Sequence, residues 1–218
     1  MSVDGLTFET LTLERPGDHL LCVTLDRPEV RNALNTQMGF DLRDLWVELY
    51  RDPADVRCVI LTGRGDKAFC AGGDLKERNG MTNADWRRQH ALFEQMVRAQ
   101  LDCPVPIIAA VNGAAYAGGL EIVMGCDFAY AVPGARFALT EVTLGIMPGA
   151  AGTQNLPRAV GLRRGPLEGG GVGDRGQDRG QRADFRASGQ EVDQRFGADG
   201  SQERLRFRDR GLQPHRRD

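Results

Sequence analysis

The chain has 218 residues, enough for one domain or for one domain with an appendage, and its formal net charge at pH 7 is -2. This near-neutral charge gives no basic signature, so nucleic-acid binding is not expected. The sequence contains no run of about 18 apolar residues, so a membrane span is not expected either. The first ten residues lack a basic and an apolar leader segment, which argues against secretion. Five cysteines without a CxxC pair indicate reduced, mostly buried thiols, so we expect a cytoplasmic protein that binds no metal.

The first half of the chain predicts a strand, a helix and a second strand. Residues Leu20 to Pro28 (LLCVTLDRP) predict a strand followed by a turn, and Val56 to Gly63 predict a short buried strand. Between them, Asn35 is a suitable N-cap for a helix that ends before Asp52-Pro53. The apolar residues at helical spacing in this helix are Phe40, Leu42, Leu45, Trp46, Leu49 and Tyr50.

The next hundred residues continue the alternation. Residues 83–101 predict an amphipathic helix, and Pro104 to Gly113 predict a buried strand that ends in a turn. Glycines at 118 and 119 open an apolar helix, and Asp127 to Ala131 form the next predicted strand. Strands that alternate with helices indicate an α/β fold. The apolar side of the second helix is expected to comprise Trp86, Phe93, Met96, Val97 and Leu101.

The order stops after about Leu162, so we predict a folded core over residues 1–163 and an atypical tail over 164–218. The tail holds eight Leu, Ile, Val or Phe residues, against 12 Arg, 7 Asp and 3 Glu. This composition is typical of a disordered segment, and we expect no secondary structure in it.

Three interpretations of the Arg-, Gly- and Asp-rich tail stay open. It could be a disordered arm that contacts RNA, although ten acidic residues offset its arginines. It could be a solvated linker or tag. We favour the third interpretation, an out-of-frame translation of a GC-rich gene, because the change in composition is abrupt and the core already uses Arg far more than Lys.

Two glycine turns and two glutamates could form one catalytic site. Strands are expected to end at KAFCAGGDL (67–75) and at NGAAYAGGLE (112–121), where backbone N–H groups can face outward. Two such groups can bind one carbonyl oxygen as an oxyanion hole. Glu121 and Glu141 lie in apolar stretches, where a raised pKa suits general acid or base catalysis. Taken singly, a glycine-rich turn more often serves tight geometry, and a buried Glu is more often ion-paired.

Four segments together resemble the enoyl-CoA hydratase/isomerase, or crotonase, family over about residues 6–163. They are RNALN (31–35), FCAGGDL (69–75), IIAAVNGAAYAGGLEIVMGCDFAYA (107–131) and LGIMPGAAGTQNLPRAVG (144–161). The resemblance implies a spiral of repeated β-β-α units and hydration of 2-trans-enoyl-CoA thioesters to 3-hydroxyacyl-CoA. The C-terminal helices of the family are missing or replaced, which would leave apolar faces of the core uncovered and could impair activity.

By the same resemblance, Gly73 and Gly118 are the oxyanion-hole donors. Glu121 would activate water and Glu141 would protonate the α-carbon. Coenzyme A would enter as part of the substrate, so no cofactor is implied. Residues implied to contact the CoA portion are Arg31, Ala33, Ala71, Asp74 and Leu75, and those implied to line the acyl pocket are Pro148 and Gly149; for Arg31 the alternative is a solvated surface charge.

The resemblance also implies a homotrimer or a dimer of trimers, which the family builds with the C-terminal helices that this sequence lacks. Another crotonase reaction, enoyl-CoA isomerisation or a lyase reaction, stays an alternative, as does an inactive remnant or an RNA-binding protein. Ala151 and Asn155 replace the usual Gly and Arg of the family, a departure that we expect to affect local packing or a salt bridge more than chemistry.

Overall fold

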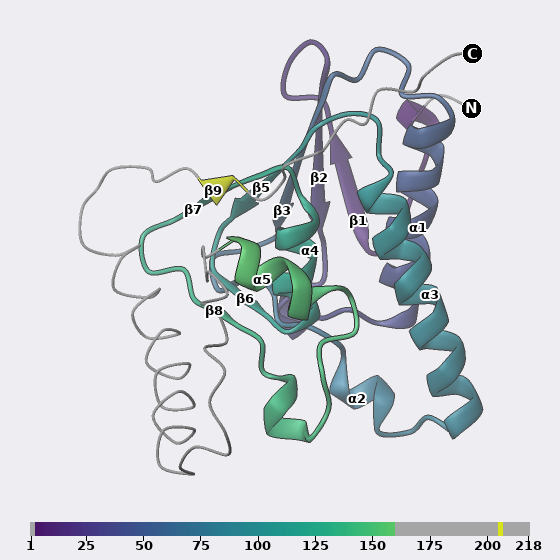
Figure 1. Cartoon of the computed structure of the whole chain (residues 1–218). Helices are drawn as coiled ribbons and strands as arrows, with labels where there is room; N and C mark the ends of the chain where they lie inside the picture. The colour runs from purple at the N-terminus through teal and green to yellow at the C-terminus, as the bar shows by residue number, and fades with distance from the viewer. Residues whose placement is uncertain (1–2, 160–204, 207–218) are drawn as a thin grey trace, which may run out of the picture.

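The computed structural model describes residues 3–159 and 205–206 (Figure 1). Residues 1–2 and 160–163 of the predicted core, and 164–204 and 207–218 of the predicted tail, lie outside the described ranges. The helices are α1 (Thr36–Arg51), α2 (Leu75–Arg78), α3 (Asn83–Leu101), α4 (Gly118–Gly125) and α5 (Gly152–Ala159), with 3-10 turns η1 (Val3–Gly5), η2 (Pro28–Val30) and η3 (Glu141–Leu144). The strands are β1 (Leu11–Glu14), β2 (Leu20–Leu25), β3 (Cys58–Gly63), β4 (Ala68–Cys70), β5 (Ile107–Val111), β6 (Ala114–Tyr116), β7 (Phe128–Ala131), β8 (Phe137–Ala138) and β9 (Leu205–Arg206).

The strands form two sheets. The larger sheet has the order β1-β2-β3-β5-β7-β9, with β2, β3, β5 and β7 parallel and the outer strands antiparallel to their neighbours. The smaller sheet has the order β4-β6-β8 and is parallel throughout. Parallel neighbours need a crossover connection, which is why helices alternate with strands along the chain.

A repeated unit of two strands and a helical segment builds both sheets, as the sequence analysis expects. In each of the pairs β3-β4, β5-β6 and β7-β8, the first strand joins the larger sheet and the second joins the smaller one. The pairs are followed by α2 and α3, by α4, and by η3 and α5. Since β4 and β6 are parallel neighbours, the turns after them lie side by side at the same edge of the smaller sheet.

Helices α1 and α3 pack against each other beside the larger sheet (Figure 1). The predicted N-cap of α1 is confirmed, because Asn35 Oδ1 accepts a hydrogen bond of 2.9 Å from the backbone N–H of Met38. Of the predicted apolar residues, Leu42, Leu45, Trp46 and Leu49 are buried, but Phe40 and Tyr50 are 39% and 64% exposed. The prediction is wrong for Phe40 because two residues, or about 200° of helix, separate it from Leu42.

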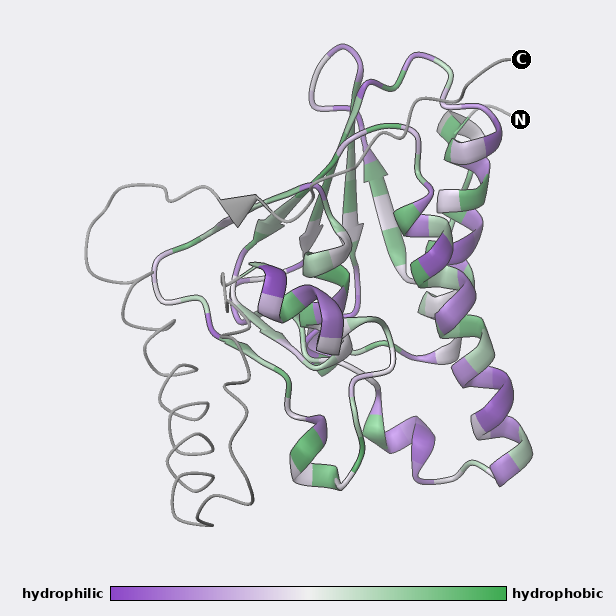
Figure 2. Ribbon diagram, viewed as in Figure 1, coloured by the Kyte–Doolittle hydropathy of each residue, from purple (hydrophilic) through white to green (hydrophobic). Residues whose placement is uncertain are grey.

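Helix α4 is buried along almost its whole length, as its apolar sequence predicts. All its residues from Gly119 to Gly125 are buried, and it is among the most apolar helical segments in Figure 2. Its close approach to β4 requires glycine, because a Cβ at Gly119 would lie 2.2 Å from the carbonyl oxygen of Cys70. The five cysteines are free thiols, and Cys70, Cys103 and Cys126 are buried, in agreement with the sequence analysis.

The edge of the larger sheet differs from the sequence prediction. Leu205–Arg206, which lie in the segment expected to lack secondary structure, form β9 and pair with β7. Pairing of this kind uses backbone N–H and C=O groups of an edge strand, so side-chain composition does not reveal it. Within the described ranges, no helix has the length and apolar character needed to cross a membrane.

Candidate active site

The loop that joins β4 to α2 is fixed by backbone hydrogen bonds to residues 31–34. Ala71 N–H donates to the carbonyl of Arg31 (3.1 Å), and Leu34 N–H donates to the carbonyl of Gly72 (2.8 Å). Asp74 N–H donates a hydrogen bond of 2.8 Å to the carbonyl of Leu34, and Leu34 and Gly73 are thereby paired in an isolated parallel β-bridge. The loop that carries Gly73 therefore has a defined path before α2 begins.

This loop abuts the turn from which α4 begins. Gly72 has φ +90°, and a Cβ on it would lie 2.8 Å from the Cβ of Ala117 and 3.5 Å from the N atom of Gly118. Gly118 is the first residue of α4, where N–H groups have no partner within the helix and the helix dipole is positive. The fold thus brings the Gly73 loop and the Gly118 turn into contact.

Gly73 and Gly118 line a cavity of about 1000 Å³. Helix α3 forms one wall, and η3 with the loop to α5 forms another. Two apolar side chains at its rim, Val142 and Met147, are 77% and 72% exposed. The other apolar lining residues are Leu34, Ala71, Leu75, Trp86, Phe93, Met96, Val97, Ala117, Leu144, Ile146, Pro148 and Ala150.

Glu121 faces this cavity from the first turn of α4. Its side chain is buried, and its Oε1 atom accepts hydrogen bonds from the backbone N–H groups of Ala150 (2.7 Å) and Gly152 (2.8 Å). Burial raises the pKa of the Glu121 carboxyl, and the two N–H donors act in the opposite direction by stabilising the ionised form. One oxygen is thus fixed at the start of α5, and the carboxylate faces the cavity.

Glu141 faces the same cavity from the start of η3. It is also buried, and its Oε2 atom has no hydrogen-bond partner among the described residues. Burial is the main cause that raises the pKa of Glu141. A hydrogen bond from its own backbone N–H lowers the pKa, the negative charge of Glu121 raises it, and the charge of Arg78 lowers it. The fold therefore unites two buried carboxylates with two glycine turns in one cavity.

This arrangement can be compared with known proteins. The family model described as enoyl-CoA hydratase/isomerase matches residues 17–165. The chain belongs to the enoyl-CoA hydratase/isomerase family. The crystal structure of an enoyl-CoA hydratase from Bacillus anthracis is similar to this chain, with 39% sequence identity and a TM-score of 0.68. The match covers 72% of this chain and 60% of that chain. This likeness confirms the crotonase fold.

Relatives in the enoyl-CoA hydratase/isomerase family agree with this assignment. The (E)-benzylidenesuccinyl-CoA hydratase of Thauera aromatica is 41% identical over 150 residues, which cover 69% of this chain and 57% of that protein. The crotonyl-CoA hydratase of Syntrophomonas wolfei is 40% identical over 156 residues, which cover 72% of this chain and 59% of that protein. The matching part of the chain thus spans between half and two thirds of the length of these relatives.

Most residues that the family resemblance singles out line the cavity. Besides the two glycines and two glutamates, Ala71, Leu75, Pro148 and Gly149 belong to its lining. Arg31 and Ala33 are outside the lining; Arg31 is exposed with φ 56°, and Ala33 is buried with its carbonyl accepting a bond of 2.6 Å from Arg27.

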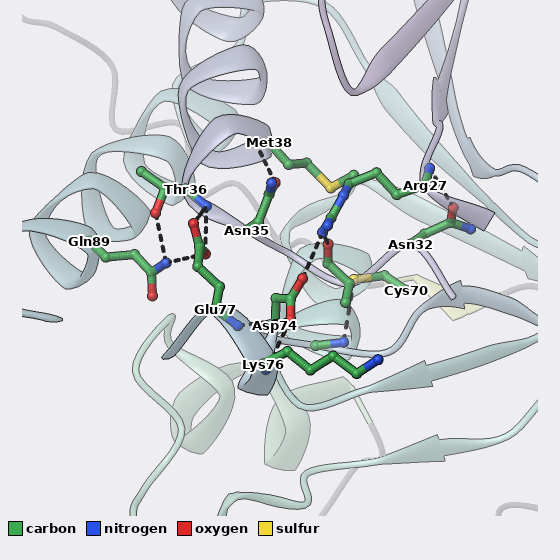
Figure 3. Close-up of polar contacts among 12 residues, drawn as sticks. Arg27, Asn32, Asn35, Thr36, Met38, Cys70, Asp74, Lys76, Glu77 and Gln89 are labelled. Atoms are coloured by element: carbon green, nitrogen blue, oxygen red, sulfur yellow. Dashed lines mark hydrogen bonds and ion pairs between the residues drawn. The ribbon is translucent and has the colours of Figure 1, made fainter. Parts of the chain in front are cut away.

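Asp74 also lies outside the lining and has structural partners. Its carboxylate caps α2 by accepting from the N–H groups of Lys76 and Glu77, and it pairs with Arg27 at 3.1 Å (Figure 3). Burial acts to raise the pKa of Asp74, but these hydrogen bonds and the Arg27 charge outweigh it, so the pKa is lowered. The side chain of Asp74 thus stabilises the loop that carries Gly73.

Sequence reasoning missed the wall that α2 and α3 contribute. Trp86, predicted to lie on the buried side of α3, is 44% exposed and stacks on His90, with ring centroids 5.2 Å apart. His90 reaches across the cavity, since a Cβ on Gly149 would lie 3.0 Å from its Cε1 atom. Helical periodicity marks such residues only as apolar or polar, and it does not reveal a cavity between two elements.

Proposed function

We propose that this site adds water to a 2-trans-enoyl-CoA thioester and forms the 3-hydroxyacyl-CoA. The observation that carries the proposal is that Glu121 and Glu141, both buried, line one cavity with Gly73 and Gly118. Family membership supports hydration in general, and the residue roles below are our inference from the geometry.

The backbone N–H groups of Gly73 and Gly118 would bind the thioester oxygen. Attack of water at the β-carbon moves an electron pair through the α-carbon to this oxygen and produces an enolate. Backbone dipoles that are fixed by the surrounding fold stabilise such a charge without reorganisation, and losing one such donor typically costs on the order of 10²–10³ in rate. The contact between the two loops at Gly72 and Ala117 supports this pairing, because it sets their separation.

The two glutamates would divide the proton transfers. Glu121, whose ionised form is favoured by two N–H donors, accepts a proton from water as its oxygen bonds to the β-carbon. Glu141 is buried, and its Oε2 atom has no hydrogen-bond partner in the described part of the chain, which favours the protonated form; it donates a proton to the α-carbon as the enolate collapses. The sum is addition of one water molecule, and proton exchange between the carboxyl groups or with solvent resets the site.

A direct experiment is to incubate the full chain with crotonyl-CoA and follow the loss of the conjugated double bond, with 3-hydroxybutyryl-CoA identified by mass spectrometry. Hydration supports the proposal, and no product at micromolar enzyme rejects it. Isomerisation is the alternative reaction, and incubation with a 3-enoyl-CoA distinguishes it, because an isomerase returns the 2-enoyl-CoA without a gain of water.

The homotrimer or dimer of trimers and the cytoplasmic location stay predictions. Sedimentation of the full chain at several concentrations tests the assembly. An RNA electrophoretic shift that is salt-sensitive and lost on deleting residues 164–218 would instead support the RNA-binding alternative.

A further inference from the structure

Arg78 brings a positive charge to the cavity, beside the glycine turn that is expected to bind the thioester. A Cβ on Gly73 would lie 2.9 Å from Cζ of Arg78, 3.0 Å from Nη1 and 3.2 Å from Nη2, so the guanidinium covers one side of the Gly73 backbone. Both residues line the cavity that Glu121 and Glu141 face. The hydration chemistry above gives this charge no role.

The guanidinium of Arg78 is fixed at its Nε end. Nε donates to Oε1 of Gln89 at 2.9 Å, and the guanidinium carbon lies 5.6 Å from the centre of the Phe93 ring. Gln89 is buried, and its Nε2 atom donates to Thr36 Oγ1 (2.9 Å) and to Glu77 Oε2 (2.8 Å), as Figure 3 shows. Because both ends of the Gln89 amide are hydrogen-bonded, the charge is held in one place.

The two Nη groups of Arg78 have no hydrogen-bond acceptor among the described residues, and no carboxylate oxygen of these residues lies within 4.0 Å of the guanidinium nitrogens. Burial lowers the pKa of this half-buried guanidinium, and the charges of Glu77 and Glu141 act in the opposite direction. A cation that is partly withdrawn from water without an ionic partner is stabilised by any negative charge that develops beside it.

We propose that Arg78 adds a fixed positive charge to the thioester site and stabilises the enolate oxygen together with the N–H groups of Gly73 and Gly118. The inference rests on the proposed function, because it places the thioester oxygen at the Gly73 turn. When water attacks the β-carbon, the electron pair that moves to this oxygen gives it a negative charge that the neutral substrate lacks. The guanidinium stabilises that charge without giving up a proton, because it stays ionised.

The other charged groups of the cavity explain why a cation is needed there. Within the described part of the chain, the groups of the lining that can titrate near neutral pH are Glu94, Glu121, Glu141 and His90. Each carboxylate that is ionised repels an enolate in the same cavity. In that part of the chain, Arg78 is the one permanently charged cation of the lining, so it offsets this repulsion at every pH in the working range.

Acetoacetyl-CoA tests the proposal without any hydration. This thioester loses a proton from its α-carbon to give an enolate that absorbs in the near ultraviolet, so titrating the ligand bound to the full chain gives the pH of half ionisation. Arg78→Met should raise that pH by about one unit, and Arg78→Lys, which keeps the charge, by less than about half a unit. Arg87→Met, at an exposed position of α3 outside the lining, should leave it unchanged.

Two features of this design isolate the charge at position 78. The other titratable groups of the lining are the same in all variants, so differences between the variants report the substitution itself. If circular dichroism shows that Arg78→Met is unfolded, Arg78→Gln takes its place, because it keeps polar hydrogen-bond donors without the charge. Equal pH values of half ionisation in the unmodified, neutral and Lys proteins would overturn the proposal.

Turnover of crotonyl-CoA gives a second readout. Arg78→Met should lower kcat about 10- to 100-fold and change KM less than about threefold, because the charge acts on the enolate and not on the neutral substrate. Arg78→Lys should recover part of the lost kcat. A rise in KM at unchanged kcat would overturn the proposal and place Arg78 on the CoA portion.

The two readouts separate this inference from the hydration proposal. If the chain leaves crotonyl-CoA unchanged, but Arg78→Met raises the pH of half ionisation of bound acetoacetyl-CoA, the hydration proposal fails and the role of Arg78 stands. If crotonyl-CoA is hydrated and the substitution shifts neither that pH nor kcat, the role of Arg78 fails and hydration stands. If the unmodified chain binds no acetoacetyl-CoA, the role of Arg78 fails whatever the result with crotonyl-CoA.

Discussion

Oε1 of Glu121 accepts two backbone hydrogen bonds, whereas Oε2 of Glu141, in the same cavity, is buried without a hydrogen-bond partner among the described residues. Each backbone donor to a carboxylate favours its ionised form, and burial favours the protonated form; Glu121 accepts from the N–H groups of Ala150 and Gly152, whereas Glu141 accepts from its own backbone N–H. The two carboxyl groups therefore differ in environment although both have raised pKa values. This difference distributes the roles of base and acid between them.

Replacing Glu141 by Gln tests the proposed acid. The amide has nearly the same shape as the carboxyl group but cannot act as a general acid toward the α-carbon. The kcat for crotonyl-CoA hydration should therefore fall at least about 10²-fold. Glu29→Gln, at an exposed position of η2, should leave kcat within about twofold. If Glu141→Gln hydrates at the unmodified rate, the assigned role is wrong.

The raised pKa of Glu141 also predicts how stability depends on pH. Its folded-state pKa lies above the ordinary value of 4.5, so the folded state binds more protons than the unfolded state between the two values. The resulting stabilisation is fully present below the unfolded pKa and is lost as pH rises through the folded pKa. The free energy of unfolding in urea should therefore fall, relative to Glu141→Gln, as pH increases from about 4.5 toward neutrality. Parallel pH profiles of the two proteins would contradict the prediction.

The backbone donors to Glu121 can be disturbed at Gly152. A Cβ there would lie 2.8 Å from Oε1 and 3.1 Å from Cγ of Glu121, so Gly152→Ala must displace the carboxylate from its two N–H donors. We expect kcat for hydration to fall about tenfold or more, with circular dichroism unchanged. Ala151→Gly, one residue earlier, places no atom near Glu121 and serves as the control. Unaltered kcat in Gly152→Ala would show that these donors do not position the base.

The sequence predicted the elements whose pattern is local. Helix α1 with its Asn35 cap, helix α3 over residues 83–101, and strands β2, β3, β5 and β7 follow from periodicity and capping. The short strand β8 was not predicted, because two residues carry no measurable alternation. Its partner is set by the β-β-α repeat, which is a property of the whole fold.

The residues of the candidate site also fall into those that the sequence pattern reveals and those that only tertiary packing reveals. The two glycine turns, Glu121 and Glu141 could be named because such turns and acids in apolar stretches are visible in the sequence, and the family resemblance singled out Gly73 and Gly118 within the turns. Arg78 could not, since a charged residue in a short helix usually faces solvent. Its place in the cavity depends on Gln89, eleven residues further along the chain, and only tertiary packing brings the two together.

The contact between α4 and β4 predicts a large effect on stability. A Cβ at Gly119 would lie 2.2 Å from the carbonyl oxygen of Cys70 and 2.8 Å from its Cβ, and neither group can rotate away. Gly119→Ala should therefore lower the free energy of unfolding by about 3 kcal/mol. Gly17→Ala, where the nearest atom would lie 3.7 Å away, should change it by less than about 0.5 kcal/mol. Urea unfolding measures both, and equal values would mean that α4 does not pack this closely on β4.

Ala151 predicts a substitution that stabilises the chain. Its φ is 70°, in the left-handed region that favours glycine, and glycine is the residue that the family resemblance implies at this position. An alanine in this conformation is strained by about 1–2 kcal/mol in the folded state, and glycine removes that strain. The greater conformational entropy of glycine in the unfolded chain offsets about 0.4–1 kcal/mol of the gain. Ala151→Gly should therefore raise the free energy of unfolding by about 1 kcal/mol. Ala91→Gly, at an exposed position within α3, should lower it by about 1 kcal/mol, because no left-handed strain is relieved there. Opposite signs in urea unfolding are the expected result, and a loss of stability in both variants would contradict the left-handed conformation of Ala151.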